Sequence, residues 1–126
     1  MHTVVLTPTF LADCRDAGLS EDAVSEIAAA ISTEPQAGDL IPGTGGARKR
    51  RFAGRGKGKS GGYRTVSYFA GYDVPVLLLA LINKGERADI SQAERGALKK
   101  ELAGYAADYR ESVRKRVIAF RTRGKS

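Results

Sequence analysis

The sequence predicts an α+β domain in which two N-terminal helices and one C-terminal helix pack on a small, mainly antiparallel sheet. Apolar residues recur with a helical period near both ends of the chain, and three strand patterns follow one another in the middle. Short turns separate these strands, which is typical of antiparallel pairing. A chain of 126 residues is also long enough to bury one core. We therefore expect the order β-α-α-β-β-β-α.

The N-terminal third predicts one strand and two helices. Residues 3–6 form a short β-branched run. Thr7 is suited to cap a helix that has proline at its first position and runs to about Asp16. Ser20 can cap a second helix, which ends at Glu34 before a proline. One apolar face of this helix has i, i+3, i+4, i+7 spacing: Val24, Ile27, Ala28 and Ile31.

The middle of the chain predicts the sheet. Residues 40–41 and 48–52 could form one interrupted strand, and residues 62–70 alternate as a half-buried strand does. Residues 76–82 form the most apolar strand, so we expect it to be central.

The C-terminal part predicts a third helix that begins at a capping box, Ser91 to Glu94. Leu98, Leu102, Tyr105 and Tyr109 would form its apolar face. The pattern weakens beyond about residue 111. We therefore divide the chain into a domain of residues 1–111 and a basic tail of residues 112–126.

Positive charge is concentrated in the middle of the chain, within a net charge of +7. The segment 48–64 holds eight bases and no acid. They are Arg48, Lys49, Arg50, Arg51, Arg55, Lys57, Lys59 and Arg64. Such a cluster repels itself unless an anionic partner compensates it, so it indicates a phosphate-rich partner, RNA or DNA. A solvated loop without a ligand is the alternative.

Other classes of function find little support. No apolar run approaches the ~20 residues that span a bilayer, and there is no secretory signal pattern. One cysteine, Cys14, and one histidine, His2, argue against a disulfide, a zinc site and histidine-based nucleases. Gly58-Lys59-Ser60 resembles the end of a P-loop, but Ala53 stands where that motif requires glycine. We expect a cytoplasmic protein without metal, cofactor or membrane contact.

Three blocks of sequence carry a resemblance to a known family. They are Ile41 to Arg51, Gly56 to Arg64, and Lys84-Gly85-Glu86 before Asp89. Together they resemble the HigB-type toxins of the RelE/ParE superfamily. The resemblance implies a toxin of a type II toxin–antitoxin module that cuts mRNA in the ribosomal A site. It also implies a cognate antitoxin, typically with a helix-turn-helix domain.

The resemblance also implies a site. Cleavage in this family is a metal-free attack by the ribose 2′-OH on the adjacent phosphate. Lys49 and Arg51 match the two basic residues of a strand, and their spacing puts both on one sheet face. Lys49 would transfer a proton, Arg51 and Arg64 would hold the phosphorane, and Lys84 would complete the cluster. The residues expected to grip RNA are Arg48, Arg50, Arg55, Lys57, Lys59 and Arg87.

Some positions depart from the family pattern. Ser91 and Gly85 stand where well-known RelE proteins have a tyrosine and an additional arginine. Two alternatives therefore remain: a ParE-like inhibitor of DNA gyrase, and a basic RNA-binding protein without catalysis. Gyrase supercoiling and the appearance of cleaved RNA would discriminate among the three.

Overall fold

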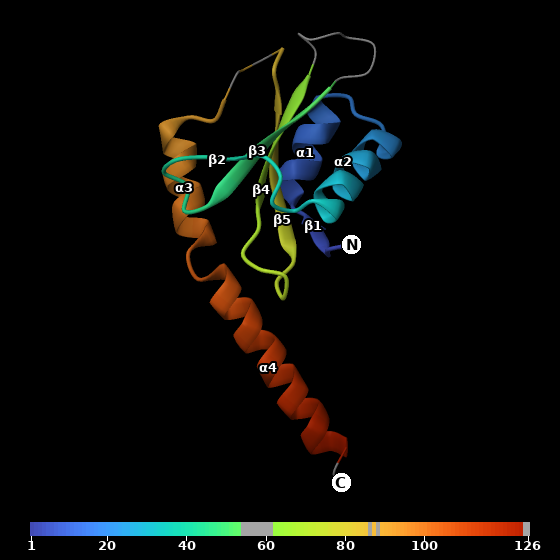
Figure 1. Cartoon of the computed structure of the whole chain (residues 1–126), viewed down its shortest axis with the longest axis vertical. Coiled ribbons are helices and arrows are strands. Elements are labelled where there is room, and N and C mark those ends of the chain that lie inside the picture. Colours follow the sequence, from blue (N-terminus) through green and yellow to red (C-terminus); the bar gives the residue numbers. More distant parts are fainter. Residues whose placement is uncertain (54–61, 86, 88, 125–126) are drawn as a thin grey trace.

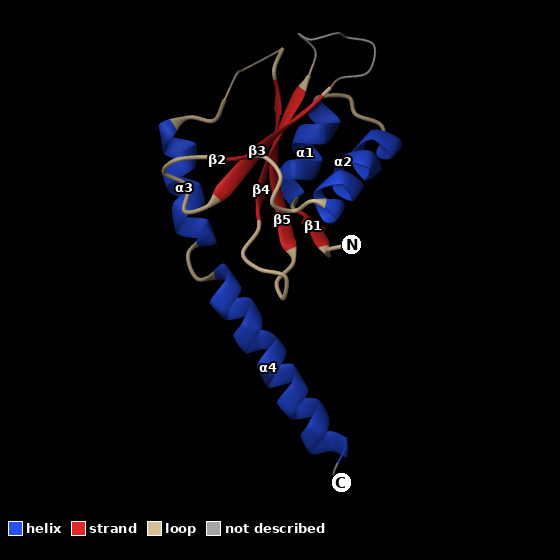
Figure 2. Ribbon diagram, in the orientation of Figure 1, coloured by secondary structure: helices blue, strands red, loops and turns tan. Residues whose placement is uncertain are grey.

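A computed structural model of the chain describes residues 1–53, 62–85, 87 and 89–124 (Figure 1). Its elements are β1 (Val4–Leu6), α1 (Pro8–Asp16), α2 (Glu21–Thr33), β2 (Asp39–Leu40), β3 (Ala47–Phe52), β4 (Tyr63–Tyr68), β5 (Val76–Asn83), α3 (Gln92–Leu102) and α4 (Tyr105–Gly124). Helices α1 and α2 lie on one side of the sheet and α3 on the other (Figure 2).

The five strands form one sheet in the order β1-β5-β4-β3-β2. Only β1 pairs in parallel, with β5, and the other three pairings are antiparallel. The predicted α+β class with a mainly antiparallel sheet is confirmed. Strand β5 is interior, as its apolar sequence predicts, although β4 is the middle strand of the order.

The predicted helix starts are confirmed by their caps. Thr7 Oγ1 accepts a hydrogen bond from the Phe10 backbone N–H, and Ser20 Oγ accepts one from Ala23. In α3 the capping box is complete, because Ser91 Oγ accepts from Glu94 N and the Glu94 carboxylate accepts from Ser91 N. These caps satisfy backbone donors that have no partner within the first turn.

The prediction of one interrupted strand over residues 40–52 is wrong. Two separate strands, β2 and β3, pair with each other in antiparallel fashion. The chain reverses between them through glycines with positive φ, Gly43 and Gly45 among them. Thr44 Oγ1 fixes the turn, because it donates to Ile41 O and accepts from Ala47 N.

The prediction of a single C-terminal helix is also wrong. Gly104, with φ of 83°, ends α3 and starts a second helix, α4, in a new direction. The apolar residues expected on one face are thus divided between two helices. The predicted tail of residues 112–126 begins inside α4, which is continuous to Gly124. No helix among the described residues is long and apolar enough to cross a membrane.

The sheet separates two apolar clusters. On the side of α1 and α2, Phe10, Ile27 and Ile31 pack against Val76 and Leu78. Cys14 belongs to this cluster, and burial raises the pKa of its thiol to about 11. On the side of α3 the buried residues are Ile41, Ala47, Val66, Ile82, Ile90 and Leu102. Each face of the sheet is therefore covered by a different part of the chain.

Candidate functional site

The alternation of β3 divides its bases between the two faces of the sheet. Arg51 pairs with Arg64 of β4, and Lys49 pairs with Val66. Residues that lie opposite each other in an antiparallel pair share a face. Val66 belongs to the cluster beneath α3. Lys49, Arg51 and Arg64 therefore lie together on the α3 face, as expected.

Lys84 joins this group at the end of β5. Its backbone N–H donates to Gly62 O over 3.2 Å, which extends the β4–β5 ladder by one residue. Ile82, two residues earlier, pairs with Arg64, so Lys84 lies on the same side. The Arg51 guanidinium lowers the pKa of Lys84, and desolvation and Arg64 add to this effect. We call these four residues, Lys49, Arg51, Arg64 and Lys84, the basic cluster.

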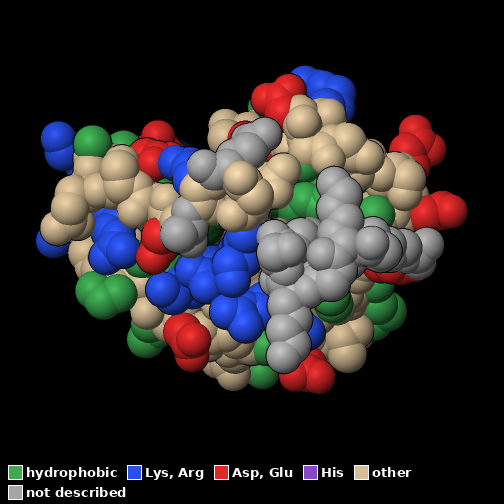
Figure 3. Space-filling model, turned by 90° about the horizontal axis from the view of Figure 1, so that it is seen from above, with side chains coloured by type: hydrophobic (Ala, Val, Ile, Leu, Met, Phe, Trp, Pro, Cys, Tyr) green, Lys and Arg blue, Asp and Glu red, His purple; other side chains and the backbone are tan. Residues whose placement is uncertain are grey.

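The basic cluster lies toward the end of the sheet that is distant from α4. Seen from that end, Lys and Arg side chains gather in one patch (Figure 3). Like charges so close together repel one another and lower stability unless an anion lies among them. The arrangement is therefore suited to bind a phosphodiester.

A carboxylate that the sequence analysis did not place lies beside Lys49. Asp89 Oδ2 is 3.5 Å from Lys49 Nζ and 3.5 Å from Arg95 Nη2. Asp89 Oδ1 accepts from the Ile90 backbone N–H over 2.8 Å. This hydrogen bond chiefly, and the positive charges of Lys49 and Arg95, lower the pKa of Asp89. Asp89 thus stabilises the position of Lys49 and ties β3 to the first turn of α3.

Arg87, expected to contact RNA, has an acidic partner. Its Nη1 lies 2.6 Å from Glu94 Oε1, which also accepts from Ser91 N over 2.9 Å. The Arg87 hydrogen bond is the main cause that lowers the pKa of Glu94 to about 2. Arg87 therefore contributes to the start of α3, and its charge is partly neutralised.

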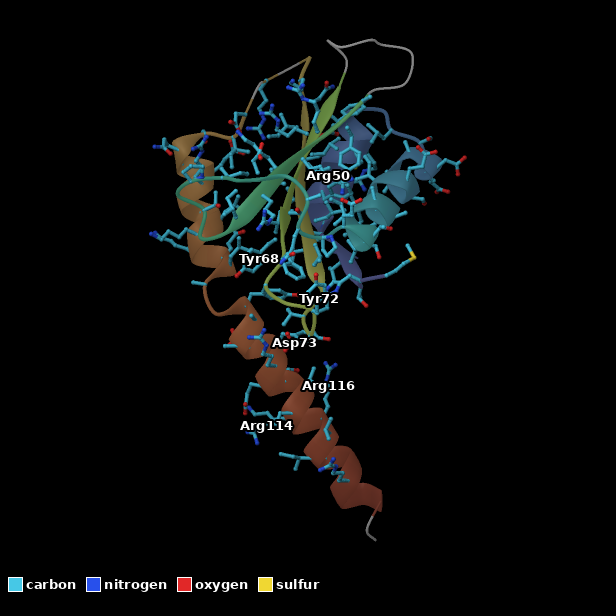
Figure 4. The ribbon with its side chains drawn as sticks, viewed as in Figure 1. Arg50, Tyr68, Tyr72, Asp73, Arg114 and Arg116 are labelled. Atoms are coloured by element: carbon cyan, nitrogen blue, oxygen red, sulfur yellow. The ribbon has the colours of Figure 1, made fainter. Side chains whose placement is uncertain are left out.

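Arg48 and Arg50 are not part of the basic cluster. Arg50 pairs with the buried Thr65, on the face that α1 and α2 cover. Its Nη1 donates to Ala30 O of α2 over 3.1 Å, and its guanidinium carbon lies 5.1 Å from the centre of the Phe52 ring (Figure 4). Arg48 Nη1 donates to Gly38 O over 3.3 Å. The remaining residues expected to bind RNA, Arg55, Lys57 and Lys59, lie outside the described residues.

The two positions that depart from the family pattern have local structural roles. Ser91 is the N-cap of α3, and the Gly85 N–H donates to Asn83 Oδ1 over 3.1 Å. Within the described part of the chain, no group of three or more His, Cys, Asp or Glu residues could hold a metal ion. The site itself offers cationic side chains and a lysine, Lys84, with a lowered pKa.

One comparison with known proteins bears on this site. The family model described as RelE toxin of the RelE / RelB toxin–antitoxin system matches residues 3–123. The matched range begins before β1, ends within the last turn of α4 and includes every residue of the basic cluster.

Proposed function

The chain belongs to the RelE toxin family and is a toxin of a toxin–antitoxin system, and from this premise we propose that it is a ribosome-dependent endoribonuclease that cleaves mRNA. The observation that carries the proposal is the basic cluster, in which three cations from β3 and β4 and a fourth just after β5 lie on one face of the sheet. Such a site can hold a phosphodiester and stabilise the additional charge of its transition state.

The proposed reaction is an intramolecular transesterification at a phosphodiester of the RNA. The ribose 2′-oxygen attacks the adjacent phosphorus, the bond from phosphorus to the 5′-oxygen breaks, and a 2′,3′-cyclic phosphate and a 5′-OH result. One group must accept the 2′-OH proton and another must protonate the leaving oxygen. Arg51 and Arg64, which are cross-strand neighbours, would hold the non-bridging oxygens through forked hydrogen bonds.

We assign the proton acceptor to Lys84 rather than to Lys49. Arg51 and Arg64 lower the pKa of Lys84, so a larger fraction of its amine is neutral near pH 7. Lys49 forms an ion pair with Asp89, whose Oδ2 lies 3.5 Å from Lys49 Nζ, so its ammonium group already has a partner. Lys49 is then the proton donor to the leaving 5′-oxygen.

The cellular partners follow from the family. A toxin of this family has a cognate antitoxin. We propose that the module is of the HigB type, with a helix-turn-helix antitoxin, because of the glycine-basic blocks around residues 41–51 and 56–64. Action on ribosome-bound mRNA would place the protein in the cytoplasm.

The proposal is tested in a reconstituted translation reaction. The purified protein is added with and without ribosomes, and mRNA ends are mapped by primer extension. Cuts within codons that require ribosomes support the proposal, and the fragments should carry 2′,3′-cyclic phosphate ends. Intact mRNA in the presence of a folded protein would overturn it, and a gyrase supercoiling assay on the same preparation would then test the ParE-like alternative.

A further inference from the structure

The second half of α4 projects from the body of the protein. Its first turns are attached: Tyr105 Oη donates to Pro75 O over 2.9 Å, and Arg110 forms a two-point ion pair with Asp73. From Glu111 to Ala119 every residue is exposed. Figure 1 shows this segment extending away from the sheet, at the end opposite the basic cluster. We call residues 112–121 the helical arm.

The helical arm is strongly basic. From residue 112 to residue 126 the sequence holds six bases and no acid. The described basic side chains of the arm are Arg114, Lys115, Arg116 and Arg121. Arg114 pairs with Glu111, with Nη2 and Oε1 2.6 Å apart. Among the described residues, no acid pairs with Lys115, Arg116 or Arg121.

The bases of the arm surround the helix rather than line one face. Arg114 and Arg116 project to opposite sides of α4 (Figure 4), and Lys115 lies between them around the axis. A helix that rests on a membrane surface has its bases on one side and its apolar residues on the other. In the arm, the exposed Val113 and Val117 lie on one side of the helix, but the exposed Ile118 lies on another side, between Arg114 and Lys115. Bases on several sides of a helix can contact the phosphates of both strands of a double helix.

We propose that the helical arm is a second nucleic-acid-binding element, separate from the cleavage site, and that its ligand is double-helical RNA. The choice of RNA over DNA rests on the proposed function, which places the protein on structured ribosomal RNA. Two contacts at opposite ends of one molecule raise the effective concentration of the cleavage site near its substrate.

A pair of matched double variants of the full-length protein tests the proposal. Lys115→Gln with Arg116→Gln removes two charges, and Val113→Gln with Val117→Gln changes the same exposed turns without removing charge. Glutamine is a good helix former, so both variants should retain α4, which circular dichroism checks. The probe is a fluorescent 20-base-pair RNA duplex, and its affinity is measured by anisotropy from about 50 to 200 mM salt.

We expect the basic variant to bind the duplex at least about tenfold more weakly, with a slope of log K against log salt smaller by about 1.8. The apolar variant should bind like the unchanged protein. Equal binding by the basic variant, or a larger loss of RNA affinity in the apolar variant than in the basic one, would overturn the proposal. Tighter binding of a DNA duplex of the same sequence would also overturn it. Duplex binding needs no cleavage, so primer extension reports separately on the proposed function.

Discussion

The two faces of β3 carry similar residues in very different surroundings. Arg48 and Arg50, on the face of α1 and α2, donate to backbone carbonyls of Gly38 and Ala30. Lys49 and Arg51, on the other face, lie with further cations from β4 and from the end of β5. A run of four consecutive bases thus contains two structural and two candidate functional residues. The surface that faces a base, and not the density of charge along the sequence, therefore decides what that base does.

The bases on the two faces of β3 also differ in their effect on the stability of the folded state. A guanidinium group that donates to a carbonyl and lies over an aromatic ring stabilises the folded state. A group of like charges that lie together destabilises it until an anion binds. Substitutions on the face of α1 and α2 should therefore lower stability, and substitutions on the face of α3 should lower activity.

The largest effect is expected at Lys84. Replacement by glutamine removes the proposed proton acceptor and should lower the cleavage rate by roughly 10²- to 10⁴-fold. The rate of the unchanged protein should rise with pH and level off at the pKa of Lys84, which lies below the ordinary 10.5, because only the neutral amine accepts a proton. Single-turnover cleavage of ribosome-bound mRNA from pH 6 to pH 10 measures both. The matched control is Lys100→Gln on α3, and an equal loss there would contradict the assignment.

The next effect is expected at Arg64. Replacement by glutamine should lower the cleavage rate by roughly 10²- to 10³-fold, because one donor to the developing charge is lost. Arg48→Gln removes the same charge from the opposite face and should cleave at a rate close to that of the unchanged protein. Similar losses in the two variants would mean that the faces do not differ in function.

Substitution of Arg50 should lower stability and leave the cleavage rate nearly unchanged. Arg50→Ala removes the hydrogen bond to Ala30 O and the contact with the Phe52 ring. We expect the free energy of unfolding to fall by about 1–2 kcal/mol, with little change in cleavage rate below the unfolding transition. Urea unfolding provides the measurement. A variant of full stability and impaired cleavage would instead place Arg50 in RNA binding.

The smallest effect is a pH dependence of stability at Glu94. Its pKa is lowered from 4.5 to about 2, so its contribution is fully present above pH 4.5 and is lost as the pH falls through about 2. The Glu94 side chain is 42% exposed, so solvent screening limits this contribution to below about 1 kcal/mol. Glu94→Gln retains an acceptor for Ser91 N and should unfold in urea with a weaker dependence on pH between 6 and 3. If the pH dependence of the unfolding free energy is unchanged in this variant, the Arg87–Glu94 pair does not contribute to the stability of α3.

Much of the fold could be predicted because its signals are local. The cap residues Thr7, Ser20 and Ser91 lie within three positions of the N–H groups that they accept from, so a sequence pattern reveals them. The alternation of a strand likewise puts Lys49 and Arg51 on one face. The same alternation assigns Arg48 and Arg50 to the other face, so the bases of this strand can be divided into two groups from the sequence alone.

The errors arose where a local pattern continued through a break. Apolar spacing persists across Gly104, although a glycine with positive φ there redirects the chain. The role of Asp89 could not be predicted, because its contact with Lys49 spans 40 residues of sequence. That contact depends on how α3 lies against the sheet. Arg95 lies in the first turn of α3, and its contact with Asp89 can be predicted only once this placement is known.

The parallel pairing of β1 with β5 has a consequence for how the chain folds. Val4 lies beside Val76, so the first strand cannot find its neighbour until most of the chain has been synthesised. Such distant contacts make folding slow, because a long loop must be closed first. The last strand to arrive, β5, leads directly into Lys84 and also covers Phe10 of α1. The cluster beneath α1 and α2 and the basic cluster thus both depend on β5, and a nascent chain without β5 would lack Lys84 of the proposed cleavage site.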